Sequence, residues 1–458
     1  MENKNNNVVV GMSVFGAIFF IFGFATTFII QLSAPVMAVF DLSEFEAQLL
    51  TSAFFIAYPI MSIPTGMMVN RIGYKWTVSL GLILMAVGSL IFLPAAKLPS
   101  YPLFLGATFI LAIGVVFLQV SANPYVTAIG PESSASSRLN LTQALNSIAT
   151  MVAPWLIAVV VFKGLNLPVD ATEEMKINYG LQVADRIPFP FIIMAIIVVV
   201  VAVALFLIKL PVIAIDKNKG SGKSIYKHPH VLLGAFAIFC YVGAEAGNAG
   251  LMTNYLKGGS LNLSSEMAAI YASIYWGGAM VGRFFGSIMF SEIKSKKYIY
   301  VACVLILAFI SGAFVTDWNW SIGGIFTGVA FINFVIMQFG NGKPARTLAI
   351  FALVAGMLGL ITTFTTGHVA LWTVVSIGLF NSIMFPNIFA LAVKDLDGSE
   401  LGAASGIINA LIVGGAVIPP LMGKIADNYG YTYAYIVPAI CYLYIFFFAV
   451  KGSKIRVA

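Results

Sequence analysis

Long apolar runs separated by short polar breaks are the feature that most restricts the fold of this chain. Runs of about 20 residues recur along almost all of its 458 residues, and a helix of that length crosses a bilayer core of roughly 30 Å. Only 9% of the residues are charged and the mean hydropathy is +0.96. The chain therefore has too little polar surface for a water-soluble globule, and we expect an all-α polytopic membrane protein.

A basic, glycine-bearing stretch divides the apolar runs into a group of six and a group of eight, which predicts 14 transmembrane helices. The runs lie near 10–35, 47–69, 77–95, 102–129, 138–162, 187–211, 231–256, 265–290, 298–316, 321–339, 348–366, 369–393, 401–423 and 431–450. We expect an N-terminal six-helix bundle over 1–212, a cytoplasmic linker over 213–230 and a C-terminal bundle over 231–458.

The distribution of lysine and arginine predicts the orientation in the membrane. With the N-terminus in the cytoplasm, 19 of the 25 basic side chains fall in cytoplasmic loops or at adjacent helix ends, and six fall on the other side. Membrane proteins carry this excess on their cytoplasmic side. An even number of spans then places both termini in the cytoplasm, and we expect a multi-pass protein of a bacterial inner membrane.

Motifs of other protein classes are missing from the sequence or incomplete. The three cysteines lie in apolar runs without the CxxC spacing of metal or redox sites. Gly222-Lys223-Ser224 is like the end of a phosphate-binding loop, but Lys217 stands where that loop needs a glycine. Paired mid-span acids, HExxH and GxSxG are missing as well. We expect no enzyme activity, no metal centre, no cofactor and no nucleic-acid partner.

Glu245 is the one carboxylate of 18 that the predicted spans place in the middle of a helix. An ionised acid at bilayer depth costs at least about 2.5 kcal/mol, so such a residue usually pairs, titrates or binds a cation. Small residues from Gly243 to Gly250 surround it, and Asn248 lies one turn along. We interpret Glu245 as a coupling site; the alternative is a protonated acid that hydrogen-bonds to a neighbouring helix. The other carboxylates, Glu44 among them, we place in loops or near span ends.

Amides on the fourth and fifth spans predict a surface for a hydroxyl-rich substrate. Gln119 and Asn123 are four apart and share a helix face. Asn140, Gln143 and Asn146 recur at intervals of three on the next span. Interhelical hydrogen bonding is the alternative use of these amides.

Two larger side chains in the eighth span also carry functional interpretations. The indole of Trp276 offers an apolar face to the C–H groups of a sugar, with core packing as the alternative. Arg283 lies toward the cytoplasmic end of the span, where we interpret it as a gate residue whose long side chain can reach the interface.

The segment Gly66-Met-Met-Val-Asn70-Arg71-Ile-Gly73-Tyr-Lys75 falls in the predicted turn between the second and third spans. Its glycines permit a tight turn, and its basic residues suit a cytoplasmic loop. The segment resembles the loop motif of the major facilitator superfamily, with Asn70 at the position of the usual aspartate. The resemblance implies two six-helix bundles that rock about a central site. The missing acid removes a charge pair that would steady the inner gate.

Other segments narrow this resemblance. Phe117 to Pro124, Arg138 to Asn146, and the stretches around Glu245 and Asn381 resemble the fucose/proton symporter family and its glucose/galactose and N-acetylglucosamine branches. The resemblance covers nearly the whole chain. Residues 346–366 then correspond to the family's ninth span, so the helix pair at about 298–339 is an insertion, which we expect to pack at the periphery.

The resemblance does not carry over the fucose mechanism. That family is recognised by acids on the first and fourth spans, whereas this chain has Ile30, next to Gln31, and Gln119 at those positions. Gln119 matches the glucose/galactose branch, some members of which are sodium-coupled. Glu245 then becomes the coupling residue by elimination, with H+ and Na+ both open, and a sodium ion would bind at Glu245. The substrate-binding residues that we predict are Gln119, Asn123, Asn140, Gln143, Asn146, Asn248, Trp276 and Asn381.

These inferences predict a monomeric secondary active transporter that couples uptake of a neutral monosaccharide, such as a hexose or N-acetylhexosamine, to H+ or Na+. Amides satisfy a neutral sugar, whereas a sugar acid favours a mid-span cation, for which Arg283 is the sole candidate. The alternatives are a uronate-type symporter, an uncoupled facilitator or exporter of a small solute, and a transport-like nutrient sensor.

Overall fold

The computed structural model describes residues 2–98, 100–129, 135–168, 170–208, 228–258, 260–289, 297–396 and 398–454. Within these ranges the chain forms helices joined by turns, without β-strands. The helices of the first half are α1 (Glu2–Gln31), α2 (Ser33–Phe40), α3 (Glu44–Phe55), α4 (Ala57–Lys97), α5 (Tyr101–Ala128), α6 (Ala135–Leu156), η2 (Ile157–Phe162), α7 (Glu173–Arg186) and α8 (Pro188–Leu207). Those of the second half are α9 (Pro229–Gly258), α10 (Ser265–Met289), α11 (Lys297–Val315), α12 (Trp320–Gln338), α13 (Pro344–Phe364), α14 (Gly367–Asn381), α15 (Met384–Ala392), α16 (Gly398–Ala410), η4 (Leu411–Val413), α17 (Gly414–Tyr429), α18 (Tyr431–Ala434), α19 (Ile436–Phe447) and η5 (Phe448–Gly452).

The count of membrane-spanning helices confirms the 14 predicted. Twelve stretches of the described chain are long and apolar enough to cross a membrane. One of them, Glu44–Lys97, consists of two legs that join at Gly73, where φ is 81°, and so it crosses twice. The 25-residue helix α10 adds a further span between α9 and α11. The fold is two six-helix bundles with one additional helix pair.

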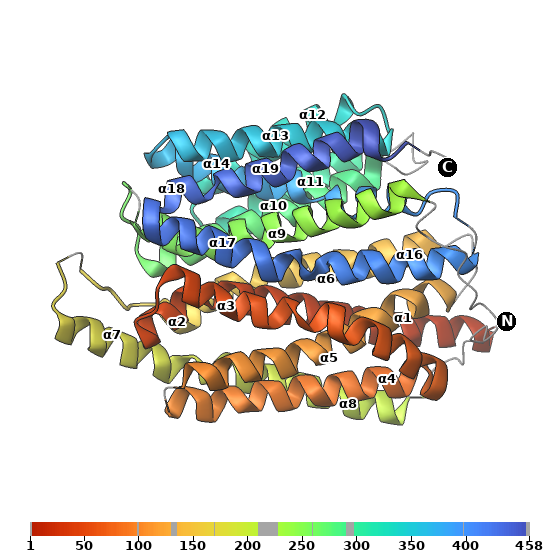
Figure 1. Cartoon of the computed structure of the whole chain (residues 1–458), viewed down its shortest axis with the longest axis horizontal. Helices are drawn as coiled ribbons and strands as arrows, with labels where there is room; N and C mark the ends of the chain where they lie inside the picture. The colour runs from red at the N-terminus through yellow and green to blue at the C-terminus, as the bar shows by residue number, and fades with distance from the viewer. Residues whose placement is uncertain are drawn as a thin grey trace.

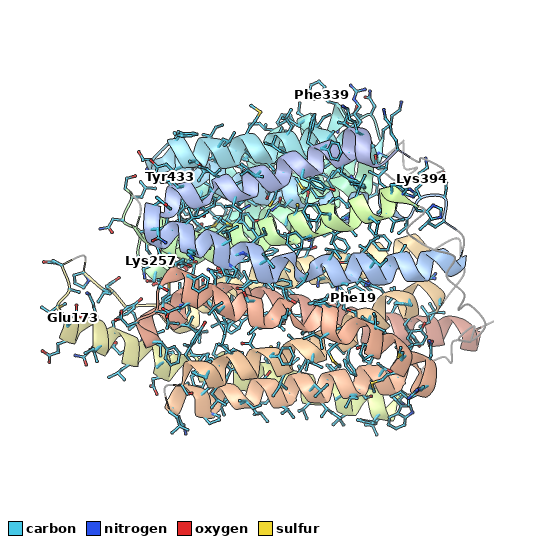
Figure 2. All side chains as sticks on the ribbon, in the orientation of Figure 1. Phe19, Glu173, Lys257, Phe339, Lys394 and Tyr433 are labelled. Carbon is cyan, nitrogen blue, oxygen red and sulfur yellow. The ribbon has the colours of Figure 1, made fainter. Side chains whose placement is uncertain are left out.

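The two bundles lie side by side with their long helices roughly parallel (Figure 1). Helices α1–α8 form the first bundle and α9–α19 the second. α1 begins and η5 ends at one end of the molecule, which also holds Lys394; we call it the terminus end (Figure 2). Glu173, Lys257 and Tyr433 lie at the opposite end, the far end. The bundles meet along α3 and α17 and along α6 and α10.

The inserted helix pair α11–α12 lies beside α10 on the outside of the second bundle. In each of the two helices 33% of the apolar stretch is buried, less than in any other candidate span, whose buried shares run from 39% to 72%. Phe334 packs against Phe285 of α10, with ring centroids 5.2 Å apart. Phe314 reaches across to Trp155 of the first bundle at 5.5 Å. This burial and these contacts place the pair at the periphery.

Helix α7 is an element that the sequence analysis did not predict. Thr172 caps it, since its side chain accepts a hydrogen bond from the backbone N–H of Met175 at 3.3 Å. α7 projects at the far end (Figure 1) and packs on α2, where Gly180 lies against the backbone oxygen of Ala38. The predicted linker, 213–230, lies outside the described residues up to position 227.

Several spans are broken near their middle or at their ends. α1 and α2 are separated at Leu32, and α14 and α15 at 382–383, where Ile383 has φ −102° and ψ 0°. The turn η4 separates α16 from α17. Breaks in membrane helices free backbone groups that can line an internal site.

Candidate functional site

Glu245 lies on the inner side of α9. Every residue from Cys240 to Leu256 is buried except Glu245, which is partly exposed. Glu245 is therefore the residue of this stretch that keeps part of its surface accessible. Its Oε1 accepts a hydrogen bond of 2.6 Å from the hydroxyl of Tyr241, and its backbone oxygen accepts one of 3.4 Å from the hydroxyl of Tyr275.

A chain of buried polar groups continues from Tyr275 across the second bundle. Asn381 donates through Nδ2 to the hydroxyl of Tyr275 at 2.8 Å, and its Oδ1 accepts from Tyr442 at 2.7 Å. Asn248 in turn donates to the hydroxyl of Tyr442 at 3.0 Å. Helices α10 and α14 come close enough for this because a Cβ at Gly378 would collide with the backbone oxygen of Tyr275. The network ties α9, α10, α14 and α19 to the residue predicted to carry coupling.

Arg283 links the second bundle to the first. Its Nη1 donates to the hydroxyl of Ser147 on α6 at 2.9 Å, and its Nε donates to the backbone oxygen of Ser382 at 3.4 Å. Ser382 lies in the break between α14 and α15. The guanidinium is also the positive charge that acts on Glu245, although the pair is not within the 4.0 Å of an ion pair. Arg283 thus points between the bundles instead of out to the membrane surface.

The first bundle presents amides on α5. Gln119 and Asn123 are both partly exposed, and Oε1 of Gln119 accepts a hydrogen bond of 2.7 Å from the buried hydroxyl of Tyr58. That bond holds the amide plane, so the Nε2 group of Gln119 has a fixed direction. The two amides lie on one face, as their spacing predicts.

The amides on α6 divide between helix packing and the interbundle face. Asn146 is buried, and its Nδ2 donates to the backbone oxygen of Phe19 on α1 at 3.0 Å. This bond holds α6 against α1, so Asn146 serves the interhelical hydrogen bonding that was the alternative to substrate binding. Gln143 is partly exposed, and the side chain of Asn140 lies outside the described residues.

Three of the predicted substrate residues keep a buried polar atom without a protein partner among the described residues: Oδ1 of Asn123, Oδ1 of Asn248 and Nε1 of Trp276. Buried polar atoms are nearly always hydrogen-bonded, to protein, water or a ligand. Two acceptors and one donor are the groups that a polyol can satisfy. The indole of Trp276 stands edge-on to Tyr275, with centroids 5.6 Å apart.

The described residues contain no group of three His, Cys, Asp or Glu that could hold a metal ion. The site therefore offers one carboxylate, one guanidinium, amides and phenols. Such a set can bind hydroxyl groups and hold or release a single proton or monovalent cation at Glu245.

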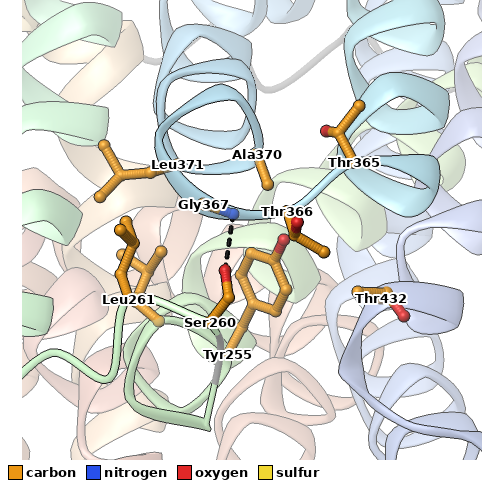
Figure 3. Close-up of a pocket in the computed structure, with 10 residues that line it drawn as sticks. Tyr255, Ser260, Leu261, Thr365, Thr366, Gly367, Ala370, Leu371 and Thr432 are labelled. Atoms are coloured by element: carbon orange, nitrogen blue, oxygen red, sulfur yellow. Dashed lines mark hydrogen bonds between the residues drawn. The ribbon is translucent and has the colours of Figure 1, made fainter.

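A separate small cavity lies at the far end of the second bundle (Figure 3). Its volume is about 60 Å³, room for a few water molecules. Tyr255, Ser260 and Gly367 line it, and the Ser260 hydroxyl accepts the backbone N–H of Gly367 at 2.7 Å. The cavity lies beside this contact between two loops and is too small to hold a sugar.

Comparison with known proteins places the fold in a family. The model of the Major Facilitator Superfamily matches residues 14–342. The chain belongs to the Major Facilitator Superfamily.

Within the superfamily, the chain is 40% identical to a glucose/galactose transporter of Brucella abortus over 441 residues, which are 95% of this chain and 92% of that one. It is 29% identical to the L-fucose-proton symporter of Escherichia coli over 460 residues, 97% and 94% of the two chains. A crystal structure of the fucose transporter in its outward conformation superimposes with a TM-score of 0.65 at 28% identity and covers 98% of this chain and all of that one.

The superfamily's loop motif forms the turn inside α4. Gly73 supplies the positive φ that the turn requires. Lys75 donates through Nζ to two backbone oxygens at the end of α8, at 3.1 and 2.8 Å, and so caps that helix. Asn70 and Arg71 are exposed, and Gly66 lies in the preceding helical leg.

The far end holds a polar cluster that sequence reasoning missed. Glu44, which we placed near a span end, is fully buried: it accepts from Gln48 at 2.7 Å, from Asn254 at 2.8 Å and from Tyr431 at 2.9 Å. Asn254 and Tyr431 belong to the second bundle. The burial of Glu44 therefore arises from residues more than 200 positions away, and its local sequence gives no sign of it.

Proposed function

We propose that this superfamily member takes up a neutral monosaccharide, a hexose or N-acetylhexosamine, by alternating access and couples that uptake to H+ or Na+. The glucose/galactose transporter and fucose symporter named above support a sugar as the substrate class. The observation that carries the proposal is the position of Glu245, a mid-span carboxylate that is partly exposed on an otherwise buried stretch of α9 and lies beside a hydrogen-bonded network that reaches its backbone oxygen.

Coupling to a cation follows from what surrounds Glu245. The carboxylate takes one hydrogen bond, from Tyr241, and the residue is partly exposed. Loading this group with a proton or a sodium ion removes the cost of a bare charge at bilayer depth. The ion can then favour the conformation in which the site is occupied, which is the condition for coupling.

A neutral substrate fits the charge of the site. Arg283 is already engaged by the backbone oxygen of Ser382 and the hydroxyl of Ser147. A sugar carboxylate would have to displace these partners from the guanidinium. The unpartnered atoms of Asn123, Asn248 and Trp276 instead suit hydroxyl groups.

The orientation is part of the proposal. With the terminus end in the cytoplasm, the excess of lysine and arginine lies on the inner side, as membrane insertion favours. The far end, with α7, then faces the outside of a bacterial inner membrane. A monomer suffices, because both bundles of the transport unit are in one chain.

Uptake into proteoliposomes tests the proposal. The purified chain is reconstituted, and uptake of glucose, galactose, N-acetylglucosamine, fucose and glucuronate is measured with an imposed sodium gradient, with an imposed pH gradient, and with neither. We expect one neutral sugar to accumulate above equilibrium under one of the two gradients. Uptake that only equilibrates would indicate a facilitator, and competition by glucuronate as strong as by the best hexose would contradict the neutral substrate.

A further inference from the structure

The loop motif between the two legs of the Glu44–Lys97 stretch has a counterpart near the end of the chain. Gly66, Asn70 and Gly73 are spaced by four and three residues, and Gly423, Asp427 and Gly430 repeat that spacing. Each segment ends one membrane helix and begins the next.

The two segments share a backbone conformation as well as a spacing. Gly73 has φ 81° and ψ 169°, and Gly430 has φ 96° and ψ 155°. Few residues other than glycine adopt this region. The segments lie at opposite ends of the molecule, because α17 and α18 meet at the far end and Lys75 caps the terminus end of α8. They are an inverted pair, as expected for bundles built from inverted repeats.

The pair differs at the middle position. Both side chains are exposed, but Asn70 has no side-chain partner within the described ranges. Asp427 instead accepts the backbone N–H of Glu44 through Oδ1 at 2.8 Å and that of Phe45 through Oδ2 at 2.9 Å. Gly423 permits the approach, since a Cβ there would lie 2.8 Å from the backbone oxygen of Glu44.

These two bonds complete the N-terminus of α3. A helix begins with four N–H groups that lack partners in the helix. Ser43 and Glu46 satisfy the first and the fourth in a capping box: the carboxylate of Glu46 accepts the N–H of Ser43, and the hydroxyl of Ser43 accepts the N–H of Glu46. Asp427, which belongs to the other bundle, satisfies the second and third, those of Glu44 and Phe45. Its negative charge also lies at the positive end of the helix dipole.

Other contacts across the far end depend on the same approach of the bundles. Gln31 donates to the backbone oxygen of Ala249 at 3.0 Å, and Ser33 to that of Gly250 at 2.7 Å. Glu44 holds Asn254 and Tyr431 of the second bundle, as described above. Opening the far end would break all of these bonds and expose the first turn of α3.

We propose that Gly423–Gly430 is a far-end copy of the superfamily loop motif, and that Asp427 is a positioning residue that holds the far end closed by capping α3 across the bundle interface. The acid that the terminus-end copy lacks at Asn70 is present here. The chain is thereby biased toward the conformation that is closed at the far end. The inference concerns the gate and depends on neither the sugar nor the coupling ion.

Distances between spin labels at the two ends test the proposal without a substrate. The three native cysteines are replaced, and one label pair is placed at the exposed far-end residues Leu98 and Tyr433. A second pair at Leu207 and Lys394, both exposed, reports on the terminus end. We expect Asp427→Asn to raise the ratio of open to closed far-end distances about fivefold, the usual effect of losing a charged cap, and to narrow the distances at the terminus end.

Two further variants separate a gate from a fold contact. Asn428→Ala removes a neighbouring side chain that bonds only within its own helix, to the backbone oxygen of Lys424, and should leave both distance distributions unchanged. Asn70→Asp should shift the terminus-end pair toward closure. If Asp427→Asn lowers the thermal midpoint while both distributions stay as in the parent chain, Asp427 only stabilises the fold and the proposal is overturned.

Discussion

The two bundles contribute different polar groups to the candidate site. The second bundle holds Glu245, the carboxylate of the site, beside a network in which Tyr275, Asn381 and Tyr442 bond to one another. It also holds Asn248 and Trp276, whose Oδ1 and Nε1 atoms have no partner among the described residues. The first bundle presents neutral amides: Gln119 has one partner, and Oδ1 of Asn123 has none among the described residues. The comparison predicts that coupling resides in the second bundle, whereas both bundles contribute to sugar recognition.

Glu245→Gln should have the largest effect, on coupling and much less on binding. Gln keeps the shape and can still accept from Tyr241, but it cannot take up a proton or supply the charge that holds sodium. Concentrative uptake should stop. Exchange of labelled for unlabelled sugar needs no net ion movement and should persist in part. Both are measured in the same proteoliposomes.

The control for that variant is Tyr241→Phe, which removes the hydrogen bond of Glu245 and keeps the carboxylate. It should retain accumulation, with a shifted dependence on the ion concentration. Concentrative uptake by Glu245→Gln at the level of the parent chain would show that this acid is structural, and the coupling site would then be sought among the carbonyls and amides of α1 and α5.

Gln119→Ala should have the next largest effect, on recognition alone. The substitution removes an amide from the sugar surface and leaves the Tyr58 hydroxyl without its partner, a cost of about 1–3 kcal/mol for a buried polar group. We expect the KM for sugar to rise about tenfold, while the ratio of accumulation with and without the ion gradient is unchanged.

Tyr58→Phe distinguishes the two uses of Gln119. If Gln119 binds sugar, this variant frees its amide and should change the KM by less than about fivefold, because one hydrogen bond contributes roughly 1 kcal/mol. An equal rise of the KM in Tyr58→Phe and Gln119→Ala would show that the amide serves only to hold α4 on α5. Gln119 would then have no part in sugar recognition by the first bundle.

Trp276→Phe should have a smaller effect. Phenylalanine keeps an aromatic face at a position that is 4% exposed, but it lacks the unpartnered Nε1–H. Loss of one hydrogen bond of about 1 kcal/mol raises the KM about fivefold. In calorimetric titrations of the parent chain, removal of one particular sugar hydroxyl should lower the affinity as much as Trp276→Phe does. In the Trp276→Phe variant, removal of that same hydroxyl should cost no further affinity. An equal loss for every analogue would assign Trp276 to core packing.

Local sequence properties predict the span count and the turn at Gly73, because each rests on the length of an apolar run or on one backbone angle. The family resemblance is needed to identify the inserted pair among those spans. Local properties do not predict α7, whose polar stretch is too hydrophilic to read as a span. They also miss Glu44 and Asp427: the second bundle buries Glu44, and the exposed Asp427 finds its two backbone partners only on α3 of the first bundle.

Within the candidate site, spacing predicts the shared face of Gln119 and Asn123, since both belong to one helix. Spacing does not predict which amides remain available. Asn146 donates to α1 and so holds α6 against it, whereas Asn248 keeps an unpartnered oxygen. That distinction depends on the neighbouring helix. Arg283 shows the same limit. Its position in the sequence predicts a side chain that reaches the membrane surface, but its hydrogen bonds to Ser147 and Ser382 place it between the bundles.

Removal of the inserted pair α11–α12 should have the smallest effect of all on transport. The pair lies outside the second bundle, carries no mid-span acid or base, and reaches the site only through its packing on α10. A chain in which a short polar turn replaces residues 297–339 should still insert and bind sugar with a KM within about twofold of the parent. Its thermal midpoint should fall, because Phe285 loses Phe334 and Trp155 loses Phe314, and burial of a large aromatic side chain contributes about 1.5–3 kcal/mol. Binding is measured on folded, monodisperse protein, so reduced stability and lost affinity are read separately. A deletion variant that remains monodisperse but has lost all sugar affinity would show that α11 and α12 hold α10, and with it Trp276 and Arg283, in the binding geometry.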